Sequence, residues 1–149
     1  MFWRAVIAFL ALPGVVAFLV PALIVRSASR AGDLQPVGLV PSIVGILLLL
    51  WCVRDFYVSG KGTLAPWAPP RNLVVTGPYR YSRNPMYVAV GLILFGWAAA
   101  FSSTTLLFYA LVVIAAFHLR VVLGEEPWLA RTHGDAWEQY RARVPRWLF

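Results

Sequence analysis

Charged residues are scarce in this chain and are absent from long stretches of it. Asp, Glu, Lys and Arg make up 13% of its 149 residues, whereas a typical soluble domain has about 25%. None of them occurs within residues 5–25, 34–53 or 85–119. A membrane-spanning helix needs roughly 20 apolar residues, so the first two stretches fit one span each and the third fits two. A chain this short cannot bury so much apolar surface by itself, which excludes an ordinary soluble domain.

Cysteine and histidine are nearly missing as well. Cys52 is the single cysteine and lies within an apolar run, so it forms no internal disulfide and has no His or Cys neighbours that could help to hold a metal. We expect a small buried side chain there and no metal site. The formal charge of +7 comes from basic residues at the ends of apolar runs, where they meet lipid headgroups. This placement argues against nucleic acid as a partner, because no basic soluble domain remains to bind it.

The apolar runs predict an all-α integral membrane bundle of about four transmembrane helices. We expect two N-terminal spans within residues 1–57, the first over about 2–25 and the second over about 37–57. The Pro13-Gly14 step predicts a kink in the first span. That run is longer than the core of a signal peptide, which has roughly 7–15 residues, so we expect a retained helix and not a cleaved leader.

The last two spans are predicted to form a tight helical hairpin. The third span begins near Asn84-Pro85, because proline is tolerated at a helix start, and it ends near Phe101. Residues 102–105 form the turn, and the fourth span then runs to about Leu123. The start of the third span should therefore lie beside the end of the fourth.

The last 25 residues are charged and aromatic, unlike the runs before them. The Gly134-Asp135 step predicts a helix end followed by the N-cap of a new helix. Trp137, Tyr140 and Val144 then recur at helical spacing and predict one apolar stripe. We therefore expect a short cytoplasmic helical segment after the last span.

The basic residues predict the orientation of the bundle. With four spans, Arg26 and Arg30 fall on one side of the membrane. The other eleven basic residues share the second side with both termini: Arg4, Arg54, Lys61, Arg71, Arg80, Arg83, Arg120, Arg131, Arg141, Arg143 and Arg146. Basic residues accumulate on the cytoplasmic side, so we expect both termini in the cytoplasm, in a bacterial-type inner membrane.

Two polar clusters flank the predicted hairpin and should face each other at one membrane surface. One precedes the third span and the other ends the fourth: Arg80, Arg83 and Asn84; Arg120, Glu125 and Glu126. Each residue taken alone fits an interface anchor, because Arg belongs at headgroup level and surface ion pairs are weak. Taken together, the two clusters face each other from the two arms of one hairpin, which favours a functional site. Polar residues that face a bundle interior in a membrane are candidates for function.

The motifs in these clusters resemble those of a known superfamily. Residues 77–87, GPYRYSRNPMY, are similar to the G-x-Y-x-x-x-R-H-P-x-Y-x-G signature of the isoprenylcysteine carboxyl methyltransferase and phospholipid methyltransferase superfamily. The tail resembles its E-E-x-x-L, F-G-x-x-Y-x-x-Y and R-V-P-R patterns. The tail residues that carry this resemblance are Glu125, Glu126, Leu129, Gly134, Trp137, Tyr140, Arg143, Val144, Pro145 and Arg146.

The resemblance covers residues 73–149, about half of the chain, with two departures from the pattern. Asn84 stands where the superfamily usually has His, and Ala89 where it usually has Gly. Asn donates hydrogen bonds but does not titrate, so no role that needs a protonatable imidazole can be carried over to Asn84. We expect one membrane domain over residues 1–149, with two N-terminal spans in 1–57 and the cofactor-binding and catalytic half in 73–149.

The resemblance implies S-adenosylmethionine as the cofactor and a membrane lipid or lipidated small molecule as the methyl acceptor. It places the cofactor between the last two spans and the C-terminal segment, and the motif positions imply these cofactor-binding residues: Tyr79, Arg83, Asn84, Tyr87, Glu126 and Tyr140. Arg120 and Glu125 are the predicted catalytic pair, and Glu126 competes with Glu125 for the acid position. Arg would pair with the cofactor carboxylate, and tyrosine rings would wall its adenine.

The sequence leaves the chemistry of the acceptor open between a carboxylate and an amine. Arg120 is the only basic residue within the fourth span, which favours a carboxylate acceptor that its planar fork can hold. On a regular helix Arg120 and Glu125 would lie on different faces. We therefore predict a break between Gly124 and Pro127 that turns Arg120, Glu125 and Glu126 toward one pocket.

Two other functions remain open at this point. Membrane reductases of the sterol type resemble the superfamily near the same Arg-His/Asn-Pro motif and use NADPH, although they generally have more spans than this chain can provide. A non-catalytic membrane scaffold would also explain the apolar composition. Binding of S-adenosylhomocysteine, of NADPH, or of neither would separate the three.

Overall fold

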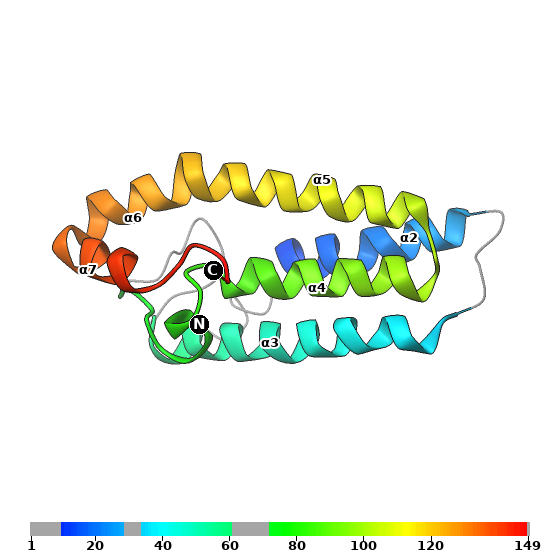
Figure 1. The fold of residues 1–149 in the computed structure, drawn as a ribbon, viewed down its shortest axis with the longest axis horizontal. Helices are drawn as coiled ribbons and strands as arrows, with labels where there is room; N and C mark the ends of the chain where they lie inside the picture. The colour runs from blue at the N-terminus through cyan, green and yellow to red at the C-terminus, as the bar shows by residue number, and fades with distance from the viewer. Residues whose placement is uncertain (1–9, 29–33, 61–71, 149) are drawn as a thin grey trace.

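The computed structural model describes residues 10–28, 34–60 and 72–148, and within them every regular element is helical (Figure 1). The elements are η1 (Leu10–Leu19), α2 (Val20–Ser27), η2 (Pro36–Gly38), α3 (Leu39–Val58), η3 (Gly77–Arg80), α4 (Pro85–Ala100), α5 (Thr104–Arg120), η4 (Val121–Glu125), α6 (Glu126–His133) and α7 (Asp135–Arg143). Helix α4 packs between α3 and α5, and η1 and α2 also contact α4 and α5. The all-α prediction is confirmed for these residues.

Two helices are long and apolar enough to cross a membrane, Pro36–Val58 with 23 residues and Thr104–His133 with 30. The apolar helices Pro13–Ser27 and Pro85–Ala100 are shorter. With 16 residues, α4 is about 24 Å long at ~1.5 Å per residue, less than the ~30 Å of a hydrocarbon layer. The count of four spans therefore stays a prediction.

The predicted boundaries of the second and third spans agree with the structure to within a few residues, whereas the fourth helix continues past the predicted end at Leu123 to His133. The second predicted span corresponds to η2 and α3, and residues 2–9 of the first lie outside the described part. Helix α4 begins at Pro85. Ser103 caps α5, because its hydroxyl accepts a hydrogen bond from the Leu106 N–H at 3.3 Å. The hairpin of α4 and α5 thus forms as predicted. At the Pro13-Gly14 step the chain widens into the π-helix η1 and stays helical.

Glycines allow α3 and α4 to pack closely. A Cβ added to Gly45 would lie 2.6 Å from the carbonyl oxygen of Ala89, and one added to Gly96 would lie 2.7 Å from the backbone nitrogen of Ser42. Leu49 of α3 joins the buried core residues of α4 in this contact. The close approach fixes α4, and therefore the motif loop before it, against α3.

The predicted helix break between Gly124 and Pro127 is wrong. The helix continues from Thr104 to His133 and widens into one π-helical segment, η4 (Val121–Glu125). There the Glu126 N–H bonds to the Val121 carbonyl, five residues back. A π turn holds more residues than an α turn, which rotates Glu125 toward the face of Arg120, and the two side chains meet without a break.

The C-terminal segment folds largely as predicted. Helix α6 ends at His133, and Gly134 has φ +49°, a left-handed conformation that favours glycine. Helix α7 begins directly at Asp135, so the N-cap is Gly134 and the predicted capping role of Asp135 is wrong. The predicted stripe of Trp137, Tyr140 and Val144 is confirmed as a buried cluster, which docks this segment onto Leu73 and α6.

Candidate active site

The motif loop, residues 77–84, is held in place by the C-terminal strap, which we define as residues 144–147. The Arg83 N–H donates to the Pro145 carbonyl at 2.9 Å. The Asn84 side-chain amide donates to the Arg146 carbonyl at 3.0 Å, and the Ser82 hydroxyl donates to the same oxygen at 3.3 Å. The strap therefore crosses the start of α4 and joins it to the end of α7 (Figure 1).

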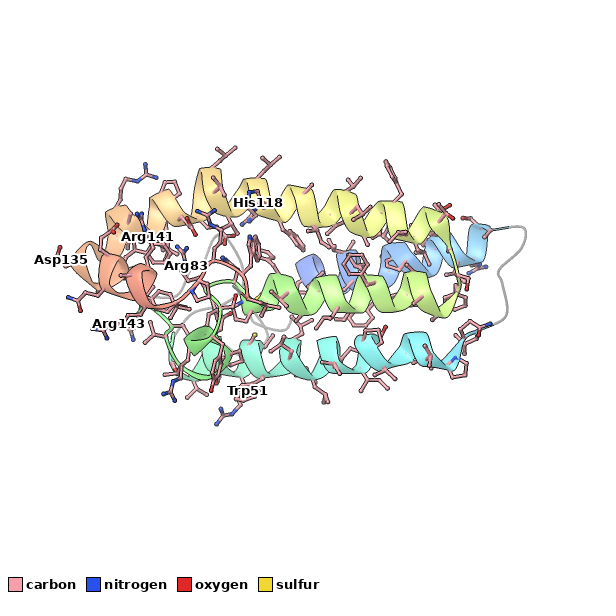
Figure 2. The ribbon with its side chains drawn as sticks, viewed as in Figure 1. Trp51, Arg83, His118, Asp135, Arg141 and Arg143 are labelled. Atoms are coloured by element: carbon pink, nitrogen blue, oxygen red, sulfur yellow. The ribbon has the colours of Figure 1, made fainter. Side chains whose placement is uncertain are left out.

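Glu126 lies between two arginines from opposite directions. Arg146 forms a bidentate pair with it, with Nε to Oε1 and Nη2 to Oε2 both at 2.9 Å. Arg83 Nη1 also lies 2.9 Å from Glu126 Oε1, and the two side chains are only 10% and 13% exposed. Figure 2 shows Arg83 at the end of the molecule where α6 and α7 lie. Paired, hydrogen-bonded geometry of this kind is needed to offset the desolvation of charges.

Arg83 keeps unused donors at this position. Its Nε and Nη1 groups are buried and make no aligned hydrogen bond to any described residue, although Nη1 is in ion-pair contact with Glu126. Its guanidinium carbon lies 5.5 Å from the centre of the Trp137 ring. Burial lowers the pKa of Arg83, and the charge of Glu126 offsets this only in part. A buried arginine with free N–H groups can accept a further anionic or carbonyl group.

Glu125 belongs to a second cluster beside the first. Tyr87 donates a short hydrogen bond to Glu125 Oε1, and Arg120 Nε donates to the same oxygen at 2.8 Å. The Tyr87 ring packs on Phe117 with 4.4 Å between the ring centres. The two neighbouring glutamates thus divide their partners, with Glu126 facing Arg83 and Arg146 and Glu125 facing Tyr87 and Arg120.

An apolar groove of about 650 Å³ lies between α4 and α5 and ends beside these clusters. Its walls carry both aliphatic and aromatic side chains, and Phe95 and Leu111 mark its far end on the two helices. At the near end the lining includes Tyr87, His118 and Trp147, which carry its polar atoms. Figure 2 shows His118 on α5, away from Arg83. The site therefore combines the two charged clusters with an apolar groove.

Comparison with known proteins identifies the family. The profile of the phospholipid methyltransferase family matches residues 35–136, which include α3, α4, α5 and all residues of the two charged clusters except Arg146. The chain belongs to the phospholipid methyltransferase family. The resemblance noted in the motifs is thereby confirmed, and membership assigns the chain to membrane methyltransferases.

A curated protein is also similar to this chain. This is a nickel-cobalt-cadmium resistance protein, NccN, of Alcaligenes xylosoxydans xylosoxydans, 29% identical over 112 residues. The match covers 75% of this chain and 48% of that protein, so the chain spans about half the length of this relative. No solved structure matches.

Tyr79, within the motif loop of this methyltransferase, and Tyr140, on α7, were predicted to bind the cofactor, and both side chains are buried. Tyr79 packs with Cys52 and Val74, and Tyr140 packs with Trp137. The Tyr140 hydroxyl donates to the Tyr79 carbonyl at 2.7 Å. Burial raises the pKa of both phenols, so Tyr140 stays a neutral donor at physiological pH. Their position favours support of the motif loop over direct contact with a ligand.

Most of the predicted site residues come together, and two further residues join them. Arg83, Asn84, Tyr87, Glu125 and Glu126 gather with Arg120 at one end of the hairpin, whereas Arg80 is exposed and away from these contacts. Sequence reasoning missed Arg146 as a partner of Glu126 and Trp147 as a groove residue. The R-V-P-R resemblance could have indicated Arg146, but no pattern pointed to Trp147.

Proposed function

We propose that this protein transfers a methyl group from S-adenosylmethionine to an acceptor that resides in the membrane. The observation that carries the proposal is the pair of clusters, Arg83–Glu126–Arg146 and Tyr87–Glu125–Arg120, at the polar end of the apolar groove. Membership of a membrane methyltransferase family supports the reaction class. The acceptor chain would lie in the groove and its reactive end beside Glu125 and Arg120.

The residues present fit the cofactor. S-adenosylmethionine carries a carboxylate, an ammonium group, a ribose and an adenine, and when bound it supplies an electrophilic methyl group on a sulfonium. The Arg83 Nε donor, which has no partner among the described residues, suits its carboxylate, and Glu126 suits its ammonium group. Asn84 and Tyr87 line the approach from the α4 side, while Tyr79 and Tyr140 hold the loop that presents them.

Arg120 and Glu125 are the proposed catalytic residues. Arg120 holds the acceptor in line with the methyl group, and Glu125 fixes the direction of the Arg120 side chain through the 2.8 Å bond. Glu125 Oε1 accepts bonds from both Arg120 and Tyr87, so this oxygen is occupied by protein donors and the side chain positions Arg120. This supports an acceptor that needs no base, namely a carboxylate. The apolar groove would keep water away from the reacting groups.

A ligand titration on purified protein in detergent tests the proposal. S-adenosylhomocysteine should bind, and NADPH should not. Binding of NADPH alone would support a reductase of the sterol type, and binding of neither would support a scaffold. Incubation of lipid extracts with the protein and radiolabelled S-adenosylmethionine should then transfer label to a lipid-soluble product.

A further inference from the structure

The C-terminal strap carries a tryptophan into the end of the groove. Arg146 is held by its contacts with Glu126, Asn84 and Ser82. Because Trp147 follows Arg146 directly, these contacts also restrict the position of the Trp147 side chain. The Trp147 ring is among the groove-lining groups and stacks on His118, with 6.0 Å between ring centres and 29° between ring planes. A large ring thus stands on a firmly anchored strap at the point where the apolar groove meets the charged clusters.

The groove has the dimensions of one hydrocarbon chain in one leaflet. Its lining runs along α4 from Tyr87 to Phe95, a distance of about 12 Å at ~1.5 Å per residue, which is close to half of a ~30 Å hydrocarbon layer. Leu111 and Leu119 on its α5 wall are more than half exposed on the outside of the bundle. A chain can therefore enter sideways from the bilayer, with its polar end directed at Tyr87 and Trp147.

We propose that Trp147 is a specificity-determining residue for the acceptor. Its ring closes the polar end of the groove and admits single-chain amphiphiles whose polar end is small, and it excludes those with a bulky polar end. The inference rests on the proposed function, because it takes the groove to be the acceptor site. A bulky polar end is excluded because it would clash with the Trp147 ring, which the strap keeps from moving aside.

Photolabelling of the protein in lipid nanodiscs tests this inference without any turnover. The probes are a photoreactive N-acylglycine and N-acyltryptophan, which share one diazirine-bearing chain and one carboxylate and differ in the amino-acid side chain, a hydrogen in one and a bulky indolylmethyl group in the other. Labelling within the α4 and α5 peptides is measured by mass spectrometry. The wild-type protein should prefer the glycine probe by roughly 5- to 150-fold, and Trp147→Ala should bring the ratio near one.

Two further variants serve as an alternative to Trp147→Ala and as a control. Trp147→Leu keeps an apolar side chain on the strap and serves where Trp147→Ala fails to fold. Trp128→Ala removes another tryptophan, one on α6 that does not line the groove, and should keep the wild-type ratio. A wild-type ratio in a folded Trp147 variant, or equal labelling of the wild-type protein by both probes, would overturn the inference.

The result is separable from that for methyl transfer. Photolabelling needs neither S-adenosylmethionine nor methyl transfer. A size preference that depends on Trp147 would therefore support its role in specificity even if no methyl transfer is found. Conversely, if methyl transfer is found while both probes label wild-type protein equally, the proposed function stands and the role of Trp147 is wrong.

Discussion

Glu125 and Glu126 are adjacent but serve different partners. Successive residues on a helix point about 100° apart, since roughly 3.6 residues make one turn. Glu126 is therefore directed at the strap and the motif loop, where it pairs with Arg83 and Arg146. Glu125 is directed at α4 and pairs with Tyr87 and Arg120. This division is consistent with the proposed roles, in which Glu126 binds the cofactor and Glu125 serves the acceptor.

Replacing Arg83 or Glu126 by alanine should weaken the binding of S-adenosylhomocysteine. Each change removes a hydrogen bond to a charged group, which contributes roughly 1.5–3 kcal/mol, or about 10- to 150-fold in affinity. The measurement is a titration of each variant in the detergent used for the wild-type protein. Glu138→Ala is the matched control, because the Glu138–Arg141 pair is exposed, with its charged atoms 3.6 Å apart, and should leave affinity unchanged. Wild-type affinity in both site variants would contradict the assignment.

The rate of methyl transfer should depend on pH differently in variants of Arg120 and of Glu125. With a carboxylate acceptor, Arg120→Leu removes the group that holds the substrate and should lower methyl transfer by about 10- to 150-fold at every pH tested. Glu125→Gln should cost less, because Gln can still accept a bond from Arg120. The pH profiles of methyl transfer by the two variants on one lipid extract are the measurement.

The opposite profile would identify an amine acceptor. An amine is mostly protonated at neutral pH and must lose a proton before attack, so it needs a base such as Glu125. Glu125→Gln would then abolish activity at neutral pH and regain it at high pH, while Arg120→Leu would retain most of it. That outcome would show the preference for a carboxylate to be wrong.

At the level of elements, the contact between α3 and α4 positions the motif loop. Gly96→Ala places a Cβ within 2.7 Å of the Ser42 backbone nitrogen and 2.9 Å of the Gly38 carbonyl. Because both neighbours are backbone atoms, the helices must separate, and we expect a loss of about 1–3 kcal/mol of stability. Thermal unfolding of the variant in detergent measures this.

Gly91→Ala is the matched control on the same helix. A Cβ there meets only the Ile114 side chain, at 3.6 Å, which is ordinary contact. Alanine is the better helix former by roughly 0.5–1 kcal/mol, so this variant should unfold at the wild-type temperature or slightly above it. Equal destabilisation by the two substitutions would mean that the close approach of α3 and α4 does not limit stability.

At the scale of the whole molecule, the charged helix ends collect on one side. The end of α3, the start of α4, and α6 with α7 lie together, and the end of α2 lies at the opposite side (Figure 1). Both clusters of the site belong to the charged end. The excess of basic residues there predicts that this end faces the cytoplasm.

Reporter fusions in a bacterial host should place both termini in the cytoplasm. A fluorescent protein that matures only in the cytoplasm should be active when fused after Phe149, and a phosphatase active only in the periplasm should be silent there. The same phosphatase inserted in the turn at Ser102-Ser103, between α4 and α5, is the control and should be active. A periplasm-active fusion at Phe149 would overturn the topology and separate the site from the cytoplasmic cofactor.

Local patterns were sufficient to predict most of the helices and their ends. The charge-free runs predict α3, α4 and α5, because apolar composition and helix length depend only on neighbouring residues. Pro85, Ser103 and Gly134 mark helix ends through their own backbone and hydrogen-bonding preferences. The short turn also predicted that the polar cluster with Arg83 would face the one with Glu126, since it forces antiparallel neighbours, but it did not predict which side chains would pair.

The partners within the site depend on contacts between distant parts of the chain. Asn84 bonds to Arg146 across 62 residues, and Tyr140 supports Tyr79 across 61. Neither composition nor periodicity reveals which carbonyl a side chain will reach at such a separation. The π turn at Val121–Glu125 is equally hidden, because one extra residue in a turn leaves the apolar pattern almost unchanged. It nevertheless aligns Arg120 with Glu125, and packing against α4 brings Tyr87 to Glu125, so the geometry of the proposed site exists only in the folded bundle.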